Sequence, residues 1–237
     1  MEVHKDFPAH PENYQRGRAQ PVSFLVFHYV GATGGARNNA KYYHDRVLKI
    51  SAHYFVGHAS EGAAIWQSVD EGDTAWHCGR SDGKYKHPAC RNANSIGIEM
   101  CCHQDAKGGW YIDEATMATA AELGREIMAR YGIPLENVLR HYDVTGKLCP
   151  RPLIDEDKWA AFKARLEDTM TQEQFNAMMD VYLAQSREKP VSDWAKNTWD
   201  KAMAAGVFDG TAPQNPLTRE QAALVLDRLG LLEGKEG

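Results

Sequence analysis

The longest apolar runs of the chain predict buried strands. Residues 22–30, VSFLVFHYV, are rich in β-branched and aromatic side chains, and residues 95–102, SIGIEMCC, form a second such run. Runs of this length and composition are typical of strands inside a sheet. Shorter strands are predicted at 52–58 and 63–67, with Gly62 as the turn between them, and at 138–141.

Other segments repeat their apolar residues with a helical period. Ala36, Ala40, Tyr43 and Val47 predict an amphipathic helix over about 36–49. A second helix is predicted from Asp113 to Gly132, and a third from the N-cap residue Asp155. Strands mixed with crossing helices predict an α/β domain over about residues 15–168, with a mixed central β-sheet flanked by helices.

After residue 168 the pattern becomes purely helical and predicts a small all-helical C-terminal domain. Thr171-Gln-Glu-Gln174 has the sequence of a capping box and opens a helix with Phe175, Met178, Met179 and Tyr182 on one face. Two further helices, at about 192–205 and 218–229, are predicted after a linker at 186–191. We divide the chain into a main domain (1–168), a helical linker (169–191) and a helical hairpin (192–237).

Composition and charge exclude several classes of protein. The 237 residues are 43% hydrophobic and 25% charged, and the net charge of −5 comes without a dense basic run, so no nucleic-acid partner is expected. No stretch approaches the roughly 18 apolar residues of a membrane span, so no membrane insertion is expected. The N-terminal MEVHKD lacks the apolar segment of a secretory signal, and the five cysteines have no regular spacing. Both features predict synthesis in a reducing cytoplasm.

The sharpest chemical motif is the segment 141–152, HYDVTGKLCPRP. His141 and Cys149 flank a glycine-containing turn, and the prolines fix the backbone, so an imidazole nitrogen and the thiol sulfur can converge. Zn²⁺ accepts such mixed ligands, and catalytic zinc sites use three protein ligands with a fourth position open. His28 is the best third ligand, because a histidine inside an apolar run needs a reason to be buried. Taken singly, each residue is more often a core histidine or a small buried cysteine.

Five short motifs, in order along the chain, make a more specific pattern. They are VFHY at 26–29, SAHYFV at 51–56, AWHCG at 75–79, NSIGIE at 94–99 and the segment 141–150. With these motifs, residues 22–153 resemble the zinc-dependent N-acetylmuramoyl-L-alanine amidases, a superfamily that includes phage endolysins and peptidoglycan recognition proteins.

The resemblance implies both a metal site and a reaction. It implies that His28, His141 and Cys149 bind zinc, and that the chain hydrolyses the amide bond between N-acetylmuramic acid and L-alanine in peptidoglycan. Recycling amidases of the superfamily carry aspartate at the third ligand position, and non-catalytic recognition proteins lose the cysteine. Cys149 therefore places the chain with the lysin-like branch, and residues 1–168 are predicted to be the amidase domain.

Amide hydrolysis also needs a proton carrier and a charge that stabilises the tetrahedral oxyanion. Glu99, at the end of an apolar strand, is predicted to take a proton from the attacking water and pass it to the departing amine, as its counterpart does in some lysins. Lys147 lies two residues before Cys149, so its ammonium can reach the same pocket. The alternative for Glu99 is a salt bridge with a nearby arginine. The alternative for Lys147 is a loop lysine that is exposed to solvent and has no catalytic role.

One position departs from the family pattern. Many relatives carry a catalytic tyrosine on the second strand, in a GYxF pattern, where this chain has His53, with Tyr54 one position later. Only one of the two can face the metal, and we favour His53, because a shift by one would turn Phe55 outward. Contacts with the glycan or stem peptide are expected from Trp76, His77, Arg80 and Asn94. Trp76 is alternatively a core residue that anchors its loop.

The tail resembles a single S-layer-homology-like module. The residues that carry this resemblance are DWA at 193–195, Trp199, AAGVFDG at 204–210 and PLTRE at 216–220. Such modules are associated with cell-wall attachment. The alternative is a helical hairpin that stabilises the protein or forms a homodimer through the C-terminal helices.

The combined pattern predicts a phage or prophage endolysin. We expect it to be made in the cytoplasm and to act at the cell wall after release, with zinc as cofactor and bacterial peptidoglycan as partner. The alternative is a non-catalytic recognition protein that binds peptidoglycan and cuts nothing.

Overall fold

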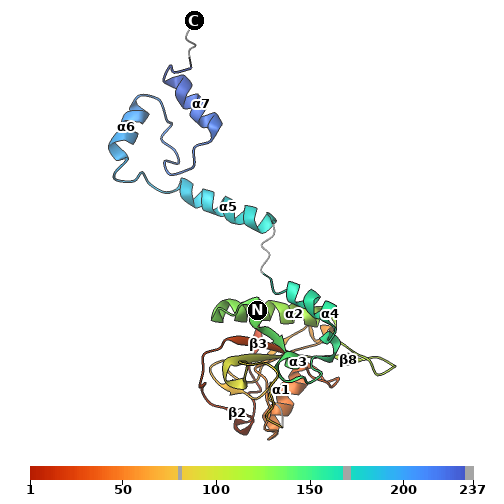
Figure 1. Ribbon diagram of the computed structural model, residues 1–237. Helices are drawn as coiled ribbons and strands as arrows, with labels where there is room; N and C mark the ends of the chain where they lie inside the picture. The colour runs from red at the N-terminus through yellow and green to blue at the C-terminus, as the bar shows by residue number, and fades with distance from the viewer. Residues whose placement is uncertain (80–81, 168–171, 233–237) are drawn as a thin grey trace. The chain divides into compact units, whose positions relative to one another are not determined.

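The computed structural model describes residues 1–79, 82–167 and 172–232, and it divides the chain into two compact units, Met1–Asp168 and Thr169–Gly237 (Figure 1). The first unit is built on a six-stranded sheet with the order β1-β5-β4-β7-β3-β10. These strands are β1 (Val3–His4), β3 (Phe24–Tyr29), β4 (Tyr54–Val56), β5 (Ile65–Gln67), β7 (Ser95–Met100) and β10 (Val138–Arg140). Neighbouring strands are parallel except for β4 and β5, so the sheet is mixed.

Helices lie on both faces of this sheet (Figure 1). Helices α2 (Glu114–Tyr131) and α4 (Glu156–Ala164) pack on one face, α1 (Ala36–Asp45) packs on the other, and the short α3 (His141–Thr145) follows β10 directly. Two small antiparallel ribbons pair β2 (Tyr14–Gln15) with β6 (Thr74–Ala75), and β8 (His103–Gln104) with β9 (Trp110–Tyr111). Short 3₁₀ turns occur at Pro11–Asn13, Ala59–Glu61, Asn92–Asn94, Leu135–Asn137 and Arg151–Leu153. The predicted α/β fold with a mixed sheet flanked by helices is confirmed.

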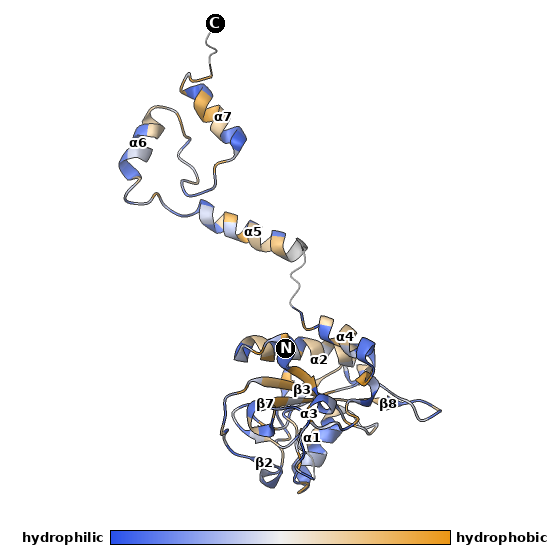
Figure 2. Ribbon diagram, viewed as in Figure 1, coloured by the Kyte–Doolittle hydropathy of each residue, from blue (hydrophilic) through white to orange (hydrophobic). Residues whose placement is uncertain are grey.

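The main core lies between the sheet and helices α2 and α4. Leu25 and Phe27 of β3 are fully buried there and pack with apolar residues of both helices, and Figure 2 shows β3 as one of the most hydrophobic segments. A Cβ atom at Gly124 of α2 would lie only 3.0 Å from Phe27 and 2.7 Å from Leu166, so glycine allows α2 to approach the strands closely. Each such buried side chain contributes about 1.5–3 kcal/mol to stability.

The strand register decides which side chains share the opposite face. In the parallel pairs, His28 lies beside Glu99, and Glu99 lies beside Phe55. Residues at the same register point to the same side of a sheet, so these three form one row on the α1 face. His53 lies two positions before Phe55 and therefore shares that face. Tyr54 points to the other face, where its hydroxyl donates to Glu71 Oε1 at 2.8 Å.

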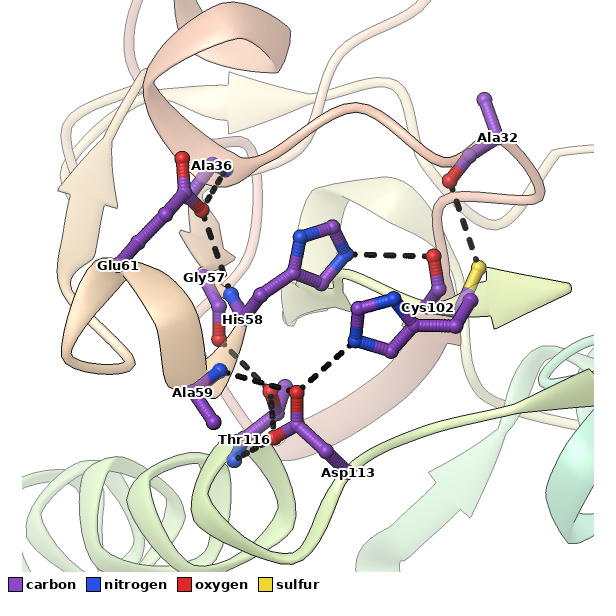
Figure 3. Close-up of polar contacts among 10 residues, drawn as sticks. Ala32, Ala36, Gly57, His58, Ala59, Glu61, Cys102, Asp113 and Thr116 are labelled. Atoms are coloured by element: carbon purple, nitrogen blue, oxygen red, sulfur yellow. Dashed lines mark hydrogen bonds and ion pairs between the residues drawn. The ribbon is translucent and has the colours of Figure 1, made fainter.

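The start of α2 is fixed by a network around Asp113 (Figure 3). The carboxylate accepts hydrogen bonds from the backbone N–H groups of Thr116 and Ala59 at 2.8 and 2.9 Å. His103 Nε2 lies 3.1 Å from the same carboxylate, and its ring stacks on His58 with the centroids 4.1 Å apart. Burial opposes ionisation, but the hydrogen bonds from Ala59, Thr116 and His103 outweigh it and lower the pKa of Asp113 to about 2. Asp113, the predicted N-cap of α2, therefore also connects the start of α2 to the segments that contain Ala59 and His103.

Several element boundaries differ from the prediction. Helix α1 ends at Asp45 rather than near residue 49, because the side chain of Asn13 bonds to the backbone of its last turn and of the segment after it. Nδ2 donates to Tyr43 O and Arg46 O, and Oδ1 accepts from the N–H groups of Leu48 and Lys49. The segment after β10 begins with the short helix α3, and the predicted glycine-containing turn follows it at Gly146. The Arg140 N–H donates to Asp143 Oδ2 at 2.8 Å and caps the first turn of α3.

The described part of the second unit contains helices α5 (Gln172–Arg187), α6 (Lys196–Ala204) and α7 (Arg219–Arg228). Thr218 and Gln221 form a capping box at the start of the last helix. Thr171, the N-cap of the capping box predicted at 171–174, lies outside the described residues. Trp199 and Phe208 stack with ring centroids 5.0 Å apart. None of the helices within the described ranges is long and apolar enough to cross a membrane.

Candidate metal centre

Three buried side chains from two parts of the first unit converge at the carboxyl ends of β3 and β10. His28 is the fifth residue of β3, His141 begins α3, and Cys149 lies in the loop after α3. One potential ligand atom from each lies within 4.8 Å of the others. Cys149 Sγ is 3.6 Å from His28 Nδ1, and the two histidine rings are 4.8 Å apart.

The hydrogen bonding of His141 indicates what these residues can hold. Both of its ring nitrogens are buried, and neither makes a hydrogen bond of ordinary geometry within the described residues, although a backbone contact with Gly79 opposes the lowering of its pKa. A buried polar atom without a partner destabilises a fold by about 1–3 kcal/mol, so most such atoms in proteins are paired. An ion coordinated by His28, His141 and Cys149 would engage one of these two nitrogens. The three residues fit a metal site.

Burial sets the protonation of the three candidate ligands. It lowers the pKa of His28 well below its ordinary value and that of His141 to about 4, with Lys147 contributing to the second shift. Both imidazoles are therefore neutral near pH 7 and have a lone pair to offer. Burial raises the pKa of the Cys149 thiol. A bound cation reverses this effect, because it stabilises the thiolate.

A cavity of about 650 Å³ opens beside the three residues. Its lining includes two further predicted site residues, Glu99 and Lys147. Glu99 is half-buried, but its Oε2 is enclosed and has no hydrogen-bond partner among the described residues. Burial raises the pKa of Glu99 to about 8, against the opposing charge of Lys147. Lys147 itself is exposed at the cavity edge. Within the described residues, no arginine forms a salt bridge with Glu99.

His77, which is predicted to contact substrate, borders the cavity but also contacts other protein groups. It is 8% exposed, and although it borders the cavity, both of its ring nitrogens face the protein. Its Nδ1 lies 3.0 Å from His28 Nε2, and its Nε2 lies 3.0 Å from Ser95 Oγ. Burial lowers its pKa to about 3. His77 therefore contacts a candidate ligand directly.

His53 lies behind His77 rather than on the cavity. Its ring centroid is 5.6 Å from that of His77, and it is not among the residues that line the cavity. Its Nδ1 accepts a hydrogen bond from the Gly97 N–H at 2.9 Å, and Arg18 Nη2 lies 2.7 Å from its Nε2. His53 thus faces the metal side of the sheet, whereas both of its nitrogens contact protein groups.

The remaining predicted contacts divide into three cases. Trp76 lines the cavity, and its backbone N–H donates to Ser51 Oγ at 2.9 Å. Asn94 does not line it, because its amide accepts from the Arg91 N–H at 2.7 Å and donates to Ala89 O at 3.1 Å. Arg80 lies outside the described residues.

Several lining residues were not singled out from the sequence. They are Tyr29, Tyr43, Lys49, Ile50 and Asn92. Tyr29 directly follows His28, so its place in the motif was an available signal. Tyr43 was predicted only as an apolar position of α1, and its approach to the cavity depends on how that helix packs.

The fold and the site together define a class: an α/β domain with a candidate metal-ligand cluster and, within the described residues, an unpaired carboxylate oxygen at one end of its central strands. The N-acetylmuramoyl-L-alanine amidase family matches this chain over residues 18–152. The match covers more than half of the chain and includes all three candidate ligands and Glu99. The chain belongs to this family.

Individual relatives agree with this assignment. The amidase CwlL of Bacillus licheniformis is 32% identical over 158 residues, which cover 63% of this chain and 42% of CwlL. The amidase BlyA of Bacillus subtilis (strain 168) is 31% identical over 165 residues, covering 65% of this chain and 43% of BlyA. This chain therefore spans less than half the length of these two relatives. The solved catalytic domain of XlyA superposes with a TM-score of 0.55 at 26% identity, over 70% of this chain and 99% of that domain.

Proposed function

We propose that this chain is a zinc-dependent amidase that hydrolyses the bond between N-acetylmuramic acid and the L-alanine of the peptidoglycan stem peptide. The observation that carries the proposal is the buried cluster of His28, His141 and Cys149, with the unpaired nitrogens of His141, beside a cavity that contains Glu99. Relatives that are named N-acetylmuramoyl-L-alanine amidases support the choice of substrate.

Zinc is the metal that this donor set favours. Two imidazole nitrogens and one thiolate are typical zinc ligands, and three protein ligands leave one position open, as catalytic sites require. Ligands about 2.0–2.3 Å from a tetrahedral ion lie roughly 3.5 Å from one another. The 3.6 Å between Cys149 Sγ and His28 Nδ1 agrees with this spacing. When bound, zinc supplies a Lewis acid that polarises the amide carbonyl and activates a water.

Two side chains of the cavity supply the remaining chemistry. The enclosed carboxylate of Glu99 takes the proton of the attacking water and delivers it to the leaving nitrogen of L-alanine. The ammonium of Lys147 stabilises the negative charge that develops on the carbonyl oxygen. The indole of Trp76 offers an apolar face to the sugar or peptide on the cavity wall.

Digestion of purified peptidoglycan, followed by mass spectrometry of the products, tests the proposal. We expect the wild-type chain to release stem peptides with a free L-alanine amine, a chelator to stop the release, and zinc to restore it. The Cys149→Ala variant should be inactive, whereas Cys90→Ala, which removes an equally buried cysteine outside the cluster, should retain activity. Intact peptidoglycan from the zinc-loaded wild type would instead favour a recognition protein, and full activity of Cys149→Ala would refute the ligand assignment.

We further propose that the chain acts at the cell wall as an endolysin, with residues 1–168 as the amidase domain and 192–237 as a wall-attachment module. The described tail exposes apolar side chains that suit a binding surface, among them Trp194, which is 89% exposed. Deleting residues 187–237 should abolish co-sedimentation with cell walls and leave cleavage of soluble fragments intact. Unchanged co-sedimentation would refute the attachment role, and conversion of a dimer to a monomer would favour dimerisation.

A further inference from the structure

A chain of four polar groups leads from the backbone of residue 91 to a candidate zinc ligand. Ser95 Oγ lies 2.7 Å from Arg91 O and 3.0 Å from His77 Nε2. His77 Nδ1 lies 3.0 Å from His28 Nε2, and His28 Nδ1 faces Cys149 Sγ at 3.6 Å. The three side chains in this hydrogen-bonded series are buried, with exposures of 0% for Ser95, 8% for His77 and 1% for His28. Water is therefore a poor competitor for these contacts.

The position of every proton along this chain follows from one fixed acceptor. A carbonyl oxygen can only accept, so the hydroxyl hydrogen of Ser95 points at Arg91 O. Ser95 Oγ must then accept from His77, which places a hydrogen on His77 Nε2. A neutral imidazole has one N–H, so His77 Nδ1 is an acceptor and takes the hydrogen of His28 Nε2. The lone pair of His28 is left on Nδ1, the nitrogen that faces Cys149.

We propose that His77 is a positioning residue that holds His28 in the tautomer and ring orientation required for binding the metal. This inference rests on the proposed zinc site and concerns a residue that does not itself ligate. A hydrogen-bonded partner on the second nitrogen of a ligating histidine fixes the tautomer and makes the ligand more basic. The opposite tautomer of His28 would point an N–H at the metal position and exclude the ion.

The sheet is shaped to admit the ring of His77. A Cβ atom at Gly97 would lie 2.6 Å from His77 Cγ and 2.7 Å from its Nδ1, closer than atoms can approach. The ring also contacts His53, whose own nitrogens contact Gly97 and Arg18. Gly97 therefore provides the space, and the contacts of Ser95, His28 and His53 fix the ring within it.

The direct test measures the tautomer of His28 in the metal-free wild-type protein. Long-range ¹H–¹⁵N correlation spectra distinguish a protonated from an unprotonated ring nitrogen, and the loss of signals in His28→Gln assigns them. We expect His28 to carry its hydrogen on Nε2 and His77 to carry it on Nε2. A hydrogen on His28 Nδ1 in the wild type would overturn the proposal without the need for any variant at His77.

Zinc affinity, measured by competition with a chromophoric chelator, gives the second test. His77→Leu should weaken zinc binding about 10- to 100-fold, the usual effect of removing a partner of a ligating histidine. His77→Gln should bind within a few-fold of wild type, because its carbonyl can accept from His28 and its amide can donate to Ser95. His103→Leu, which removes a histidine from the Asp113 network, should leave zinc affinity unchanged.

The outcomes separate this proposal from the proposed function. Wild-type zinc affinity in His77→Leu would overturn the positioning role of His77. If His77→Leu fails to fold, as judged by circular dichroism and thermal unfolding, Ser95→Ala replaces it, and it should weaken zinc binding and allow the second tautomer of His28 to populate. Normal tautomers and the expected affinity losses without any peptidoglycan cleavage would uphold the role of His77 and refute the amidase assignment.

Discussion

Replacing Glu99 by glutamine tests whether its enclosed carboxylate destabilises the metal-free fold. Glu99 Oε2 has no hydrogen-bond partner among the described residues, and burial raises the pKa of Glu99 from its ordinary 4.5 to about 8. A carboxyl with a raised pKa in the folded state contributes most stability at low pH and loses that contribution as the pH rises from about 4.5 to 8. Glutamine has the shape of the protonated form and does not titrate.

The pKa shift sets the size of the expected effect. A rise from 4.5 to about 8 corresponds to at most about 5 kcal/mol. Glu99 reaches the cavity and is not wholly enclosed, so solvent reduces this value, and we expect about 2–4 kcal/mol. Metal-free Glu99→Gln should therefore be more stable than wild type by that amount at pH 8 and nearly equal to it at pH 4.5. The zinc-loaded variant should lose about 10²- to 10⁴-fold in kcat, the usual contribution of a general base.

Urea denaturation of chelator-treated protein at pH 4.5 and pH 8 measures the stability difference. Glu136→Gln, which alters an exposed glutamate, serves as the control and should show no pH-dependent difference from wild type. A stability gain of Glu99→Gln that is the same at both pH values would show that the effect does not come from ionisation. Equal stability of variant and wild type at pH 8 would refute the inference that the metal-free fold holds an unfavourable carboxylate.

Three further variants test other parts of the structure. Lys147→Met should lower kcat about 10²-fold or more, because it removes one oxyanion-stabilising group. Zinc binding, measured by chelator competition, should not weaken, and a loss of zinc affinity would contradict the assigned role. Asp113→Ala removes the N-cap of α2 and should lower the free energy of unfolding by about 1–2 kcal/mol at pH 7 in urea titrations. Because the pKa of Asp113 is lowered to about 2, this difference in unfolding free energy should shrink as the pH falls from 3.8 to 2. A difference that stays constant over this range would refute a contribution from the ionised carboxylate. Gly97→Ala should displace the His77 ring and weaken zinc binding at least tenfold, although it changes no ligand; unchanged affinity would show that the ring moves freely.

The sequence was most informative where one local pattern decides the structure. The apolar runs predicted β3 and β7 to within two residues, and Asp113 and Gly132 marked both ends of α2, because caps and continuous burial act on neighbouring residues. The segment from His141 to Cys149 was recognisable because both residues lie on one short stretch with a turn between them.

Features that depend on distant partners could not be predicted in the same way. The early end of α1 depends on Asn13, which lies 30 positions before Tyr43 in the sequence. The contacts of His77 with Gly97, Ser95 and His28 could not be predicted, because strand pairing brings these three residues together beside it. In the turn before β7, the side chain of Asn94 bonds to its own loop, whereas Asn92 lines the cavity.

The strand order gives the candidate metal site a consequence for unfolding. β10 is an edge strand that pairs only with β3, and the segment that follows it supplies His141 and Cys149, while His28 belongs to β3 itself. An ion held by all three would link positions 121 residues apart and close a long chain loop, much as a disulfide does. In the chain-entropy picture, a cross-link around a loop of about 100 residues stabilises a fold by about 4–5 kcal/mol. Metal loss would remove this cross-link and leave β10 with β3 as its one strand neighbour, so we expect the first unit to begin to open at this edge.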